Sequence, residues 1–383
     1  MSPLIALCSN QQTLSGYGAL HQLPTLLGHT AGDVLLFASP SFLASAHWAT
    51  LAPHIAATLV DIVTVTHEAS PQQLNDWVTT WRGRCRTVVA IGGGSTLDAG
   101  KAFSTLACHP LPAERYLEKI GDTALTAERL TFLAIPTTAG TGSEVTQNAV
   151  VTDTAVLKTK ASLRHPNLVP DYAILDPALL RGTPAAVLAN CGIDAFTHLF
   201  EAYLSRQANP LTRALSLTGL RLFVEAWPFL ADSDTRGEAA REKMLNASWL
   251  GGLCLASAGL GVIHGIAGEL GALKPWHHGK VCGQLLLPFF DRLAENENEA
   301  QQSLLHELNH QLFPLAQQQF PAQHLKLWIT DNACSPFWQT TERLTPAEVT
   351  AIAERATNKY SLVDYSAADR AGLIIRAWPE GHH

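Results

Sequence analysis

The sequence has little charge and no concentration of positive charge. Aspartate, glutamate, lysine and arginine make up 15% of its 383 residues, and the formal net charge is -7 at pH 7. The lack of a basic cluster argues against a groove for nucleic acid and against an electrostatic patch for a membrane surface. Apolar residues make up 47%, which is typical of a compact globular protein and argues against a disordered chain. We therefore expect neither a nucleic-acid partner nor a membrane partner.

Long apolar runs and paired cysteines are also missing. No run approaches the length of about 18 residues that spans a bilayer, and the opening "MSPLIALCSNQQTLSGYG" lacks the basic and apolar segments of a secretory signal. The seven cysteines are scattered and contain no CxxC pair, which argues against a disulfide framework and against a thiolate zinc site. We expect a cytoplasmic protein with reduced thiols.

Apolar patterning divides the chain, whose length suits two domains, into two different halves. In the first half, short apolar runs alternate with helix-like stretches such as 73–83, which indicates a parallel sheet covered on both faces. The expected strands lie at 33–39, 59–65, 86–95, 130–138 and 172–177. After about residue 181 the periodicity is helical, with helical stretches at 209–230, 236–259 and 345–358. We predict an α/β domain over residues 1–180 and an all-helical domain over residues 181–383.

Two polar loops follow predicted strands in the first half. "IGGGSTLDAGKA" (91–102) has adjacent glycines at the start of a helix, where backbone N–H groups favour an anion. It is neither a P-loop, because Ala102 follows the lysine, nor a Rossmann fingerprint, because Leu97 replaces a glycine. Phosphate binding is favoured over a purely structural turn. The second loop, "PTTAGTGSEVTQN" (136–148), is equally compatible with a polar ligand and with a solvated loop.

Histidines and one aspartate occur at a spacing that suits a metal ion. Asp194 and His198 are four residues apart, so a helix places them on one face. Alone, such a pair is more often a local hydrogen bond. His264, however, lies in a glycine-rich apolar helix, with His277 and His278 expected at its far end. Imidazole and carboxylate groups together suit zinc or ferrous iron, so Asp194, His198, His264 and one of the paired histidines can form a four-ligand site.

The motifs of both halves together resemble the iron-containing (group III) alcohol dehydrogenase family, essentially from end to end. The resemblance is carried by "GGGSTLDAGKA", "PTTAGTGSEVTQNAVVTD", "DPALL", "GIDAFTHLFEAYLS" and "HGIAGELGALKPWHHG" followed by "LLLPF". It implies a dehydroquinate synthase-like fold, with an N-terminal α/β dinucleotide-binding domain containing a parallel sheet and an all-α C-terminal metal-binding domain. It also implies one divalent ion, Fe(II) or Zn(II), the cofactor NAD or NADP, and a homodimer.

The resemblance also implies roles for individual residues. The metal ligands would be Asp194, His198, His264 and His278, the last because it precedes Gly279 as in the family's His-Gly pair. Positions that match the family's cofactor and nicotinamide contacts are Ser39, Gly92, Gly93, Gly94, Ser95, Asp98, Thr137, Thr138, Thr141, Asn148, Val150, Lys160 and Leu179.

Two positions depart from the family pattern. Members usually have another histidine one turn after the third ligand, and this chain has Gly268 there. A proton relay would then use His277, which we take as the candidate catalytic residue, or water. NAD-preferring members often have an aspartate where this chain has Ser39, and because serine does not repel a 2′-phosphate, both NAD and NADP stay open.

The resemblance implies reversible hydride transfer between a nicotinamide and a small alcohol or aldehyde. Two other functions stay open. One is an enzyme of the dehydroquinate synthase and glycerol dehydrogenase branch, acting on a polyol or a phosphorylated substrate. The other is a non-catalytic protein that binds a metal and a nucleotide, for which Gly268 is the only support.

Overall fold

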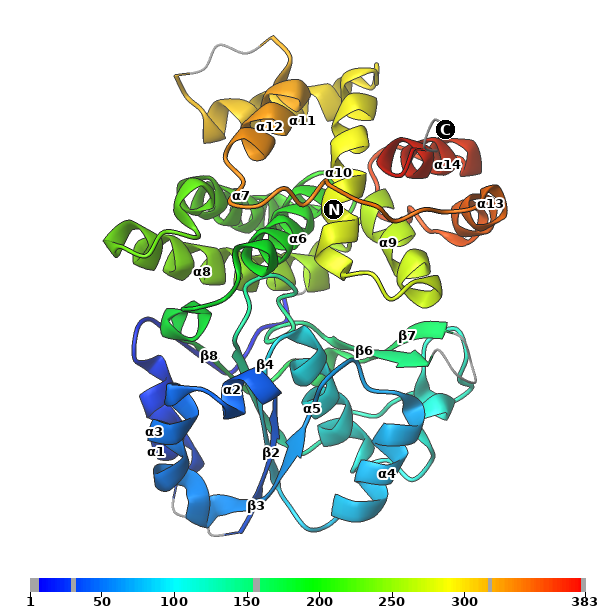
Figure 1. Cartoon of the computed structure of the whole chain (residues 1–383). Helices are drawn as coiled ribbons and strands as arrows, with labels where there is room; N and C mark the ends of the chain where they lie inside the picture. The colour runs from blue at the N-terminus through cyan, green and yellow to red at the C-terminus, as the bar shows by residue number, and fades with distance from the viewer. Residues whose placement is uncertain (1–6, 29–31, 154–158, 316–318, 380–383) are drawn as a thin grey trace. The chain divides into compact units, whose positions relative to one another are not determined.

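The computed structural model describes residues 7–28, 32–153, 159–315 and 319–379 (Figure 1). These residues form two compact units, which divide between Gly182 and Thr183. The first unit contains the sheet, and the second contains the long helices.

The first unit is built on a six-stranded sheet whose paired strands are all parallel. Across the sheet the strands are β1 (Gln12–Ser15), β8 (Tyr172–Leu175), β5 (Thr131–Pro136), β4 (Thr87–Gly92), β2 (Val34–Ala38) and β3 (Leu59–Thr64). The five predicted strands are all present. The edge strand β1 was not predicted, because it is short and Leu14 is its one apolar residue.

Side chains that alternate along each strand pack on opposite faces of this sheet. Leu35 and Phe37 of β2 contribute to one hydrophobic cluster, whereas Val34 and Leu36 contribute to another. The first cluster includes residues of α4 (Pro71–Trp81) and α5 (Gly94–Leu106), and the second includes residues of α1 (Leu23–Leu27), α2 (Pro40–Leu43) and α3 (Ala46–Ile55). Helices therefore cover both faces (Figure 1), as continuous apolar strands require.

A separate antiparallel hairpin, β6 (Asn148–Asp153) with β7 (Thr159–Arg164), follows the second polar loop. The sequence analysis did not predict it. In β6 the burial alternates, with Ala149 and Val151 buried between more exposed neighbours. Its buried side belongs to the same cluster as α4 and α5, so the hairpin extends the core of this unit.

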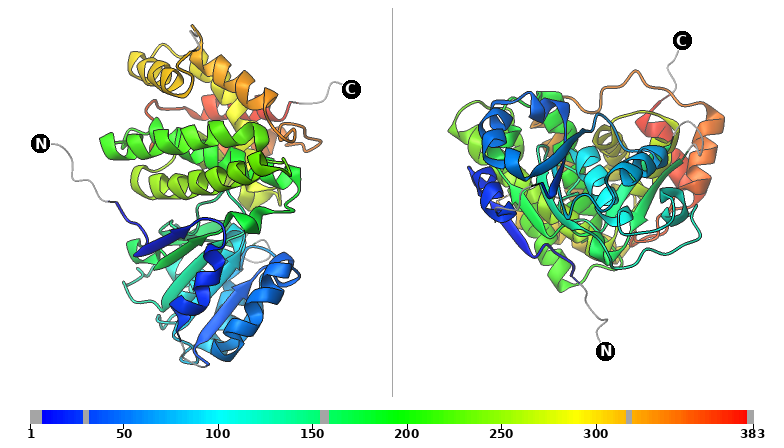
Figure 2. Two further views of the ribbon diagram at one scale, coloured as in Figure 1. Left: turned by 90° about the vertical axis from the view of Figure 1, so that its left-hand side faces the viewer. Right: turned by 90° about the horizontal axis from the view of Figure 1, so that it is seen from below.

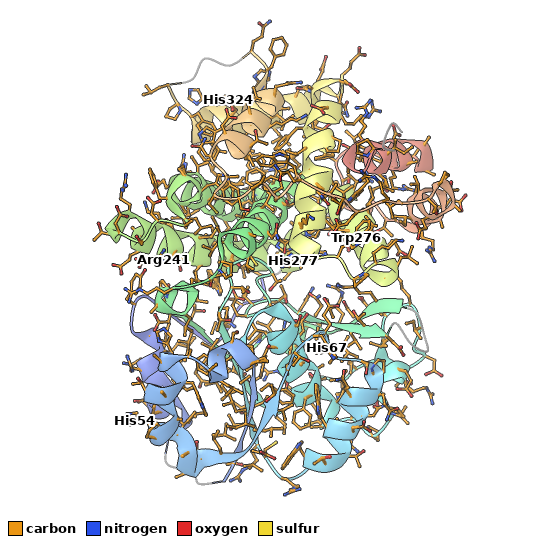
Figure 3. The ribbon with its side chains drawn as sticks, in the orientation of Figure 1. His54, His67, Arg241, Trp276, His277 and His324 are labelled. Carbon is orange, nitrogen blue, oxygen red and sulfur yellow. The ribbon has the colours of Figure 1, made fainter. Side chains whose placement is uncertain are left out.

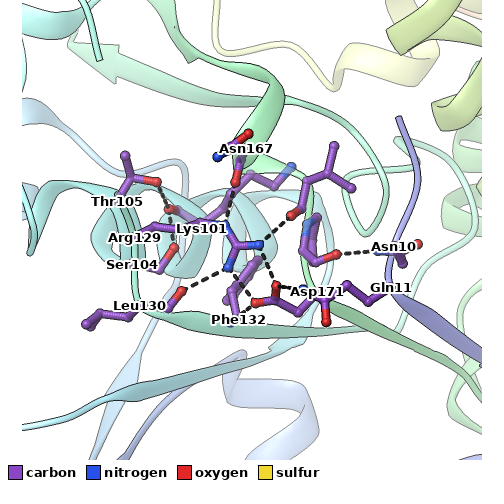
Figure 4. A network of polar contacts seen from close by, with 12 residues as sticks. Asn10, Gln11, Lys101, Ser104, Thr105, Arg129, Leu130, Phe132, Asn167 and Asp171 are labelled. Carbon is purple, nitrogen blue, oxygen red and sulfur yellow. Dashed lines mark hydrogen bonds and ion pairs between the residues drawn. The ribbon is translucent and has the colours of Figure 1, made fainter. Parts of the chain in front are cut away.

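Arg129 ties the entries of β5 and β8 together (Figure 4). Its guanidinium donates to both carboxylate oxygens of Asp171, at 2.5 and 2.7 Å, and to the carbonyl oxygen of Val169 at 3.1 Å. Asp171 also accepts a hydrogen bond of 2.9 Å from the backbone N–H of Phe132. Bidentate pairing of this kind has a fixed geometry, so it sets the relative position of two neighbouring strands.

The second unit is helical over its described residues, as predicted. Its helices are α6 (Ala185–Tyr203), α7 (Pro210–Ala226), α8 (Thr235–Ala258), α9 (Val262–Leu273), α10 (His278–Ala294), α11 (Glu299–Leu312), α12 (Pro321–Asp331), α13 (Pro346–Arg355) and α14 (Ala367–Ala377). In two orientations, α6 lies among α7, α8 and α10, with which it makes its main contacts (Figures 1 and 2). The only β-type pairing within these residues is an isolated bridge between Ser205 and Ser361.

Among the described residues, no single helix has both the length and the apolar character needed to cross a membrane. One consecutive pair, α8 and α9, meets the length and composition criteria together, with a bend of 98° between them.

Candidate functional site

Helix α6 places an apolar face and a polar face on opposite sides. Phe196 and Phe200 stack with ring centroids 5.4 Å apart, and Phe196 also contacts Phe223 of α7 at 4.9 Å. Asp194, His198 and Glu201 are spaced four and three residues apart, so they follow one another along a single side of the helix. All three are almost completely buried. Aromatic packing therefore fixes the helix that carries the candidate metal ligands.

The helix that contains His264 ends before the paired histidines. Helix α9 ends at Leu273, and Lys274 is extended, with φ -130° and ψ 137°. A residue before proline is pushed out of the helical region, and Pro275 follows Lys274. The expectation that His277 and His278 lie at the far end of the helix containing His264 is therefore wrong. His278 is instead the first residue of α10.

Gly279 allows the start of α10 to approach α6. A Cβ atom added to Gly279 would lie 2.1 Å from the carbonyl oxygen of Asn190 and 3.1 Å from Cβ of Asp194. Only glycine fits this approach, which gives the His-Gly pair a structural reason. As a result, Nε2 of His278 lies 3.8 Å from Oδ1 of Asp194, and Nε2 of His264 lies 3.5 Å from the same oxygen.

Glu201 fixes the orientation and the tautomer of His264. Its Oε2 accepts a hydrogen bond of 2.7 Å from Nδ1 of His264, and its Oε1 accepts one of 2.8 Å from the backbone N–H of Ile263. A proton on Nδ1 leaves Nε2, which faces Asp194, as the nitrogen that can bind an ion. This carboxylate–imidazole contact is the usual support for a metal-binding histidine.

We expect Glu201→Gln to lower the affinity for Zn(II) by about 10- to 100-fold, because an amide holds the Nδ1 proton less strongly than a carboxylate does. Isothermal titration of the metal-free protein measures the change. Glu299→Gln on the exposed start of α11 is the matched control and should bind as the wild type does. Equal affinity in the two variants would contradict a supporting role for Glu201.

One carboxylate oxygen lacks the partner that its burial requires. Asp194 is 2% exposed, and its Oδ1 receives no hydrogen bond from the residues that the structure describes. Burial opposes ionisation of this carboxyl, but His198, His278 and His264 outweigh that effect and hold its pKa well below the usual range. One carboxylate and several imidazoles are donors that a divalent cation can bind in place of the imidazole protons, so these residues fit Fe(II) or Zn(II).

Two other predicted residues of this region, His198 and His277, have separate surroundings. His198 stacks on His264, with ring centroids 4.5 Å apart and an angle of 21° between the rings. His277 (Figure 3) occupies the position just before α10, and its side chain makes no capping hydrogen bond to the helix. Cys282, which the sequence analysis did not select, brings its thiol to within 4.8 Å of the ligand atoms of Asp194, His264 and His278. Burial raises the pKa of this thiol to about 12.

Several of the predicted cofactor residues follow the carboxyl ends of β2, β4 and β5. The N–H of Thr137 donates to the carbonyl oxygen of Gly92 at 2.9 Å, and a Cβ atom on Gly94 would lie 2.7 Å from Cγ2 of Thr141. Ser39 begins α2 and accepts from the N–H of Phe42 at 3.3 Å. In open α/β sheets, ligands bind at this edge where the strand order reverses, and here β4 and β2 are the strands between which it reverses.

Asp98 and a buried lysine tie the second polar loop to α5. Asp98 accepts hydrogen bonds from the Ser143 hydroxyl and, at 3.0 Å, from the N–H of Val150. Lys101 donates to Asn148 O at 2.8 Å and to Thr146 Oγ1 at 3.0 Å. Burial lowers the pKa of Lys101 to about 8. These contacts position the loop, so Asp98 acts on the site through backbone placement.

The remaining predicted contacts have different surroundings. Gly93 and Thr138 approach each other, with 3.4 Å from an added Cβ atom to Oγ1, and Ser95 lies in the first turn of α5. Lys160 pairs with Glu68 at 2.7 Å. Leu179 packs in the core. Oδ1 of Asn148 is buried and accepts no hydrogen bond from the described residues.

Glu144 in the second polar loop makes the free energy of unfolding depend on pH. It is 1% exposed, and burial raises its pKa from 4.5 to about 7. A raised pKa means that the folded state holds the proton more tightly, so stability is greatest below about pH 4.5 and falls as the pH rises through 7. Between these pH values the free energy of unfolding falls by about 3 kcal/mol.

We expect Glu144→Gln to remove this fall, because the amide stays neutral. The variant should gain stability over the wild type at pH 8 and gain much less at pH 5. Urea unfolding at the two pH values measures the difference, with the exposed Glu128→Gln as control. An unchanged pH dependence would show that Glu144 is not the group responsible.

The chain matches models of a known family over both units. Residues 10–177 match the model for iron-containing alcohol dehydrogenase, and residues 188–322 match the C-terminal model of the Fe-containing alcohol dehydrogenase family. The NAD-dependent methanol dehydrogenase of Bacillus methanolicus is 30% identical over 298 residues, which cover 74% of this chain and 75% of that protein. The chain therefore belongs to the iron-containing alcohol dehydrogenase family, as predicted.

Two further relatives extend the comparison. The probable alcohol dehydrogenase EutG of Escherichia coli K12 is 42% identical over 220 residues, which are 57% of this chain and 54% of that protein. The match thus spans about half the length of that relative. A crystal structure of 1,3-propanediol oxidoreductase aligns over 98% of this chain and 100% of its own, with 25% identity and a TM-score of 0.84. This likeness confirms the predicted fold class.

Proposed function

We propose that the chain is a metal-dependent, NAD(P)-linked alcohol dehydrogenase that transfers a hydride between the nicotinamide and a small alcohol or aldehyde. The observation that carries the proposal is the approach of His264 and His278 to the buried carboxylate oxygen of Asp194, in a chain of this family.

The chain's own residues would hold and orient the metal ion. When bound, Fe(II) or Zn(II) supplies Lewis-acid stabilisation of negative charge on the substrate oxygen. Asp194, His198, His264 and His278 are the proposed ligands. Glu201 keeps the proton of His264 on Nδ1, so that Nε2 is available for the ion. The burial of Asp194 and His198 limits the water that competes for the same donors.

The loops at the carboxyl edge of the sheet would bind the dinucleotide. When bound, the nicotinamide supplies or accepts the hydride. We propose that residues 92–95 receive the pyrophosphate at the start of α5, where N–H groups favour an anion. The unpaired Oδ1 of Asn148 supports a contact of Asn148 with the nicotinamide end, beside Val150. Lys160, Leu179 and the threonines at 137, 138 and 141 complete the proposed contacts.

Two positions, Gly268 and Ser39, bear on proton transfer and on the choice of cofactor. A Cβ atom on Gly268 would meet no described atom within 4 Å, so a side chain could begin there without a clash. We propose that His277 or water moves the proton. At Ser39 neither charge nor bulk opposes a 2′-phosphate, so the chain would accept NAD or NADP.

The test is oxidation of NADH and NADPH with a panel of small aldehydes under anaerobic conditions. We expect metal-stripped protein to be inactive and Fe(II) or Zn(II) to restore activity, with one nicotinamide oxidised for each alcohol formed. Binding of cofactor and metal without turnover would favour a non-catalytic protein. Product formation without net nicotinamide oxidation would favour the dehydroquinate synthase branch.

The assembly and the location are proposals of the same kind. We propose a cytoplasmic homodimer that acts on a small alcohol or aldehyde. The support for a reducing compartment is that all seven cysteines are free thiols. Light scattering after size-exclusion chromatography tests the dimer, and a monomeric mass would contradict it.

A further inference from the structure

The thiol of Cys282 lies beside the imidazole rings of His264 and His278. It lies on α10 one turn after His278 and has an exposed fraction of 0%. Its Sγ is 3.6 Å from Nε2 of His278 and 3.7 Å from Nε2 of His264. Both nitrogens also face Oδ1 of Asp194, so sulfur, oxygen and two nitrogens converge on one point.

Hydrogen bonding alone does not account for this convergence. A thiol has one proton and can donate it to only one of the two nitrogens. The Nδ1 atom of His264 donates to Glu201, so Nε2 is the nitrogen of this ring that can face an ion. Oδ1 of Asp194 receives no hydrogen bond from the described residues. The donor atoms of Asp194, His264, His278 and Cys282 all lie within 4.8 Å of one another, and such a mixed set of oxygen, nitrogen and sulfur donors can bind a cation.

The separations agree with the edges of a zinc coordination shell. Zinc binds nitrogen and oxygen at about 2.0 Å and sulfur at about 2.3 Å, so ligand atoms at tetrahedral angles lie about 3.3–3.5 Å apart. The measured separations are 3.5 and 3.8 Å to Asp194 and 3.6 and 3.7 Å to Cys282. Contraction by a few tenths of an ångström around an ion would bring these four separations to the values of a zinc site, and the other two separations are below 4.8 Å.

We propose that the thiolate of Cys282 is a ligand of the bound metal ion, together with Asp194, His264 and His278. The thiol releases its proton to solvent when the ion binds. The stacked ring of His198 remains available as a further imidazole donor. Because sulfur is a soft ligand, the site should prefer Zn(II) to Fe(II). This inference rests on the proposed metal site, and it replaces the expectation that the chain has no thiolate zinc ligand.

Cobalt(II) titration of the metal-free protein tests the assignment without measuring activity. Sulfur–cobalt bonding produces a charge-transfer band in the near ultraviolet, whereas nitrogen and oxygen ligands give only the weaker visible bands. We expect the wild type to show the near-ultraviolet band at one cobalt per chain. Cys282→Ser should lose it, keep the visible bands and bind Zn(II) at least about 10-fold less tightly.

Cys254→Ser is the matched control, because Cys254 is an equally buried thiol of the same unit whose Sγ contacts the carbonyl oxygen of Thr212. It should keep the band. X-ray absorption of the zinc-loaded wild type, which needs no variant, should show a sulfur neighbour at about 2.3 Å. Binding of one cobalt per chain without the near-ultraviolet band, together with a zinc X-ray absorption spectrum that shows no sulfur neighbour, would overturn the role of Cys282. The metal site itself would stand. No cobalt binding at all would overturn both.

Discussion

His264→Ala should lose the metal ion and about 1,000-fold in kcat/KM for the aldehyde. Nε2 of His264 lies 3.5 Å from Oδ1 of Asp194 and 3.7 Å from Sγ of Cys282, so the substitution removes the donor between them. It also leaves Glu201 buried without the imidazole partner that it has at 2.7 Å. Loss of Lewis-acid stabilisation worth about 4 kcal/mol corresponds to the expected fall in rate.

Metal content per chain, measured by plasma emission on dialysed protein, distinguishes metal loss from general unfolding. His306→Ala replaces an exposed histidine on α11 of the same unit and should retain both metal and rate. A circular dichroism spectrum should show that His264→Ala keeps its helices. Full metal occupancy with a wild-type rate in this variant would remove His264 from the ligand set.

Periodicity predicted the sheet because the apolar runs are continuous and their two faces are both buried. Val34 to Ala38 are all buried, so β2 is apolar at every position and is recognisable without any partner. The hairpin of β6 and β7 escaped prediction because the alternating burial of β6 is not matched by alternating residue types. Ala149, Val150 and Val151 are consecutive apolar residues, and only Ala149 and Val151 are buried, so the sequence lacks the period of two that identifies a half-buried strand.

The histidines and the aspartate were recognisable from spacing, but the path of the chain between them was not. The break before α10 depends on Pro275, and the approach of α10 to α6 depends on Gly279. Neither residue identifies, from the sequence alone, the helix against which it packs. The juxtaposition of His264, His278 and Asp194 therefore follows from tertiary packing.

Cys282 was missed because the cysteines were considered only in relation to one another. Without a CxxC pair, no thiol stood out. The same rule that linked Asp194 to His198, residues four apart on one helix face, also links His278 to Cys282. A search for mixed histidine and cysteine pairs at this spacing would have found it.

Gly94→Val should weaken binding of NADH or NADPH by about 100-fold, or about 3 kcal/mol. An added Cβ atom would lie 2.7 Å from Cγ2 and 2.8 Å from Oγ1 of Thr141, so valine must displace the second polar loop. It also covers the start of α5, where the phosphates would approach the backbone. Fluorescence titration of the reduced cofactor measures the affinity.

Gly372→Val on α14 is the control, because a Cβ atom there meets no described atom within 4 Å. It should bind the cofactor normally. Gly94→Val should keep its full metal content, since Asp194, His264 and His278 belong to the other compact unit. Loss of cofactor affinity with retention of metal would show that the two sites assemble independently. Wild-type affinity in Gly94→Val would place the pyrophosphate away from this loop.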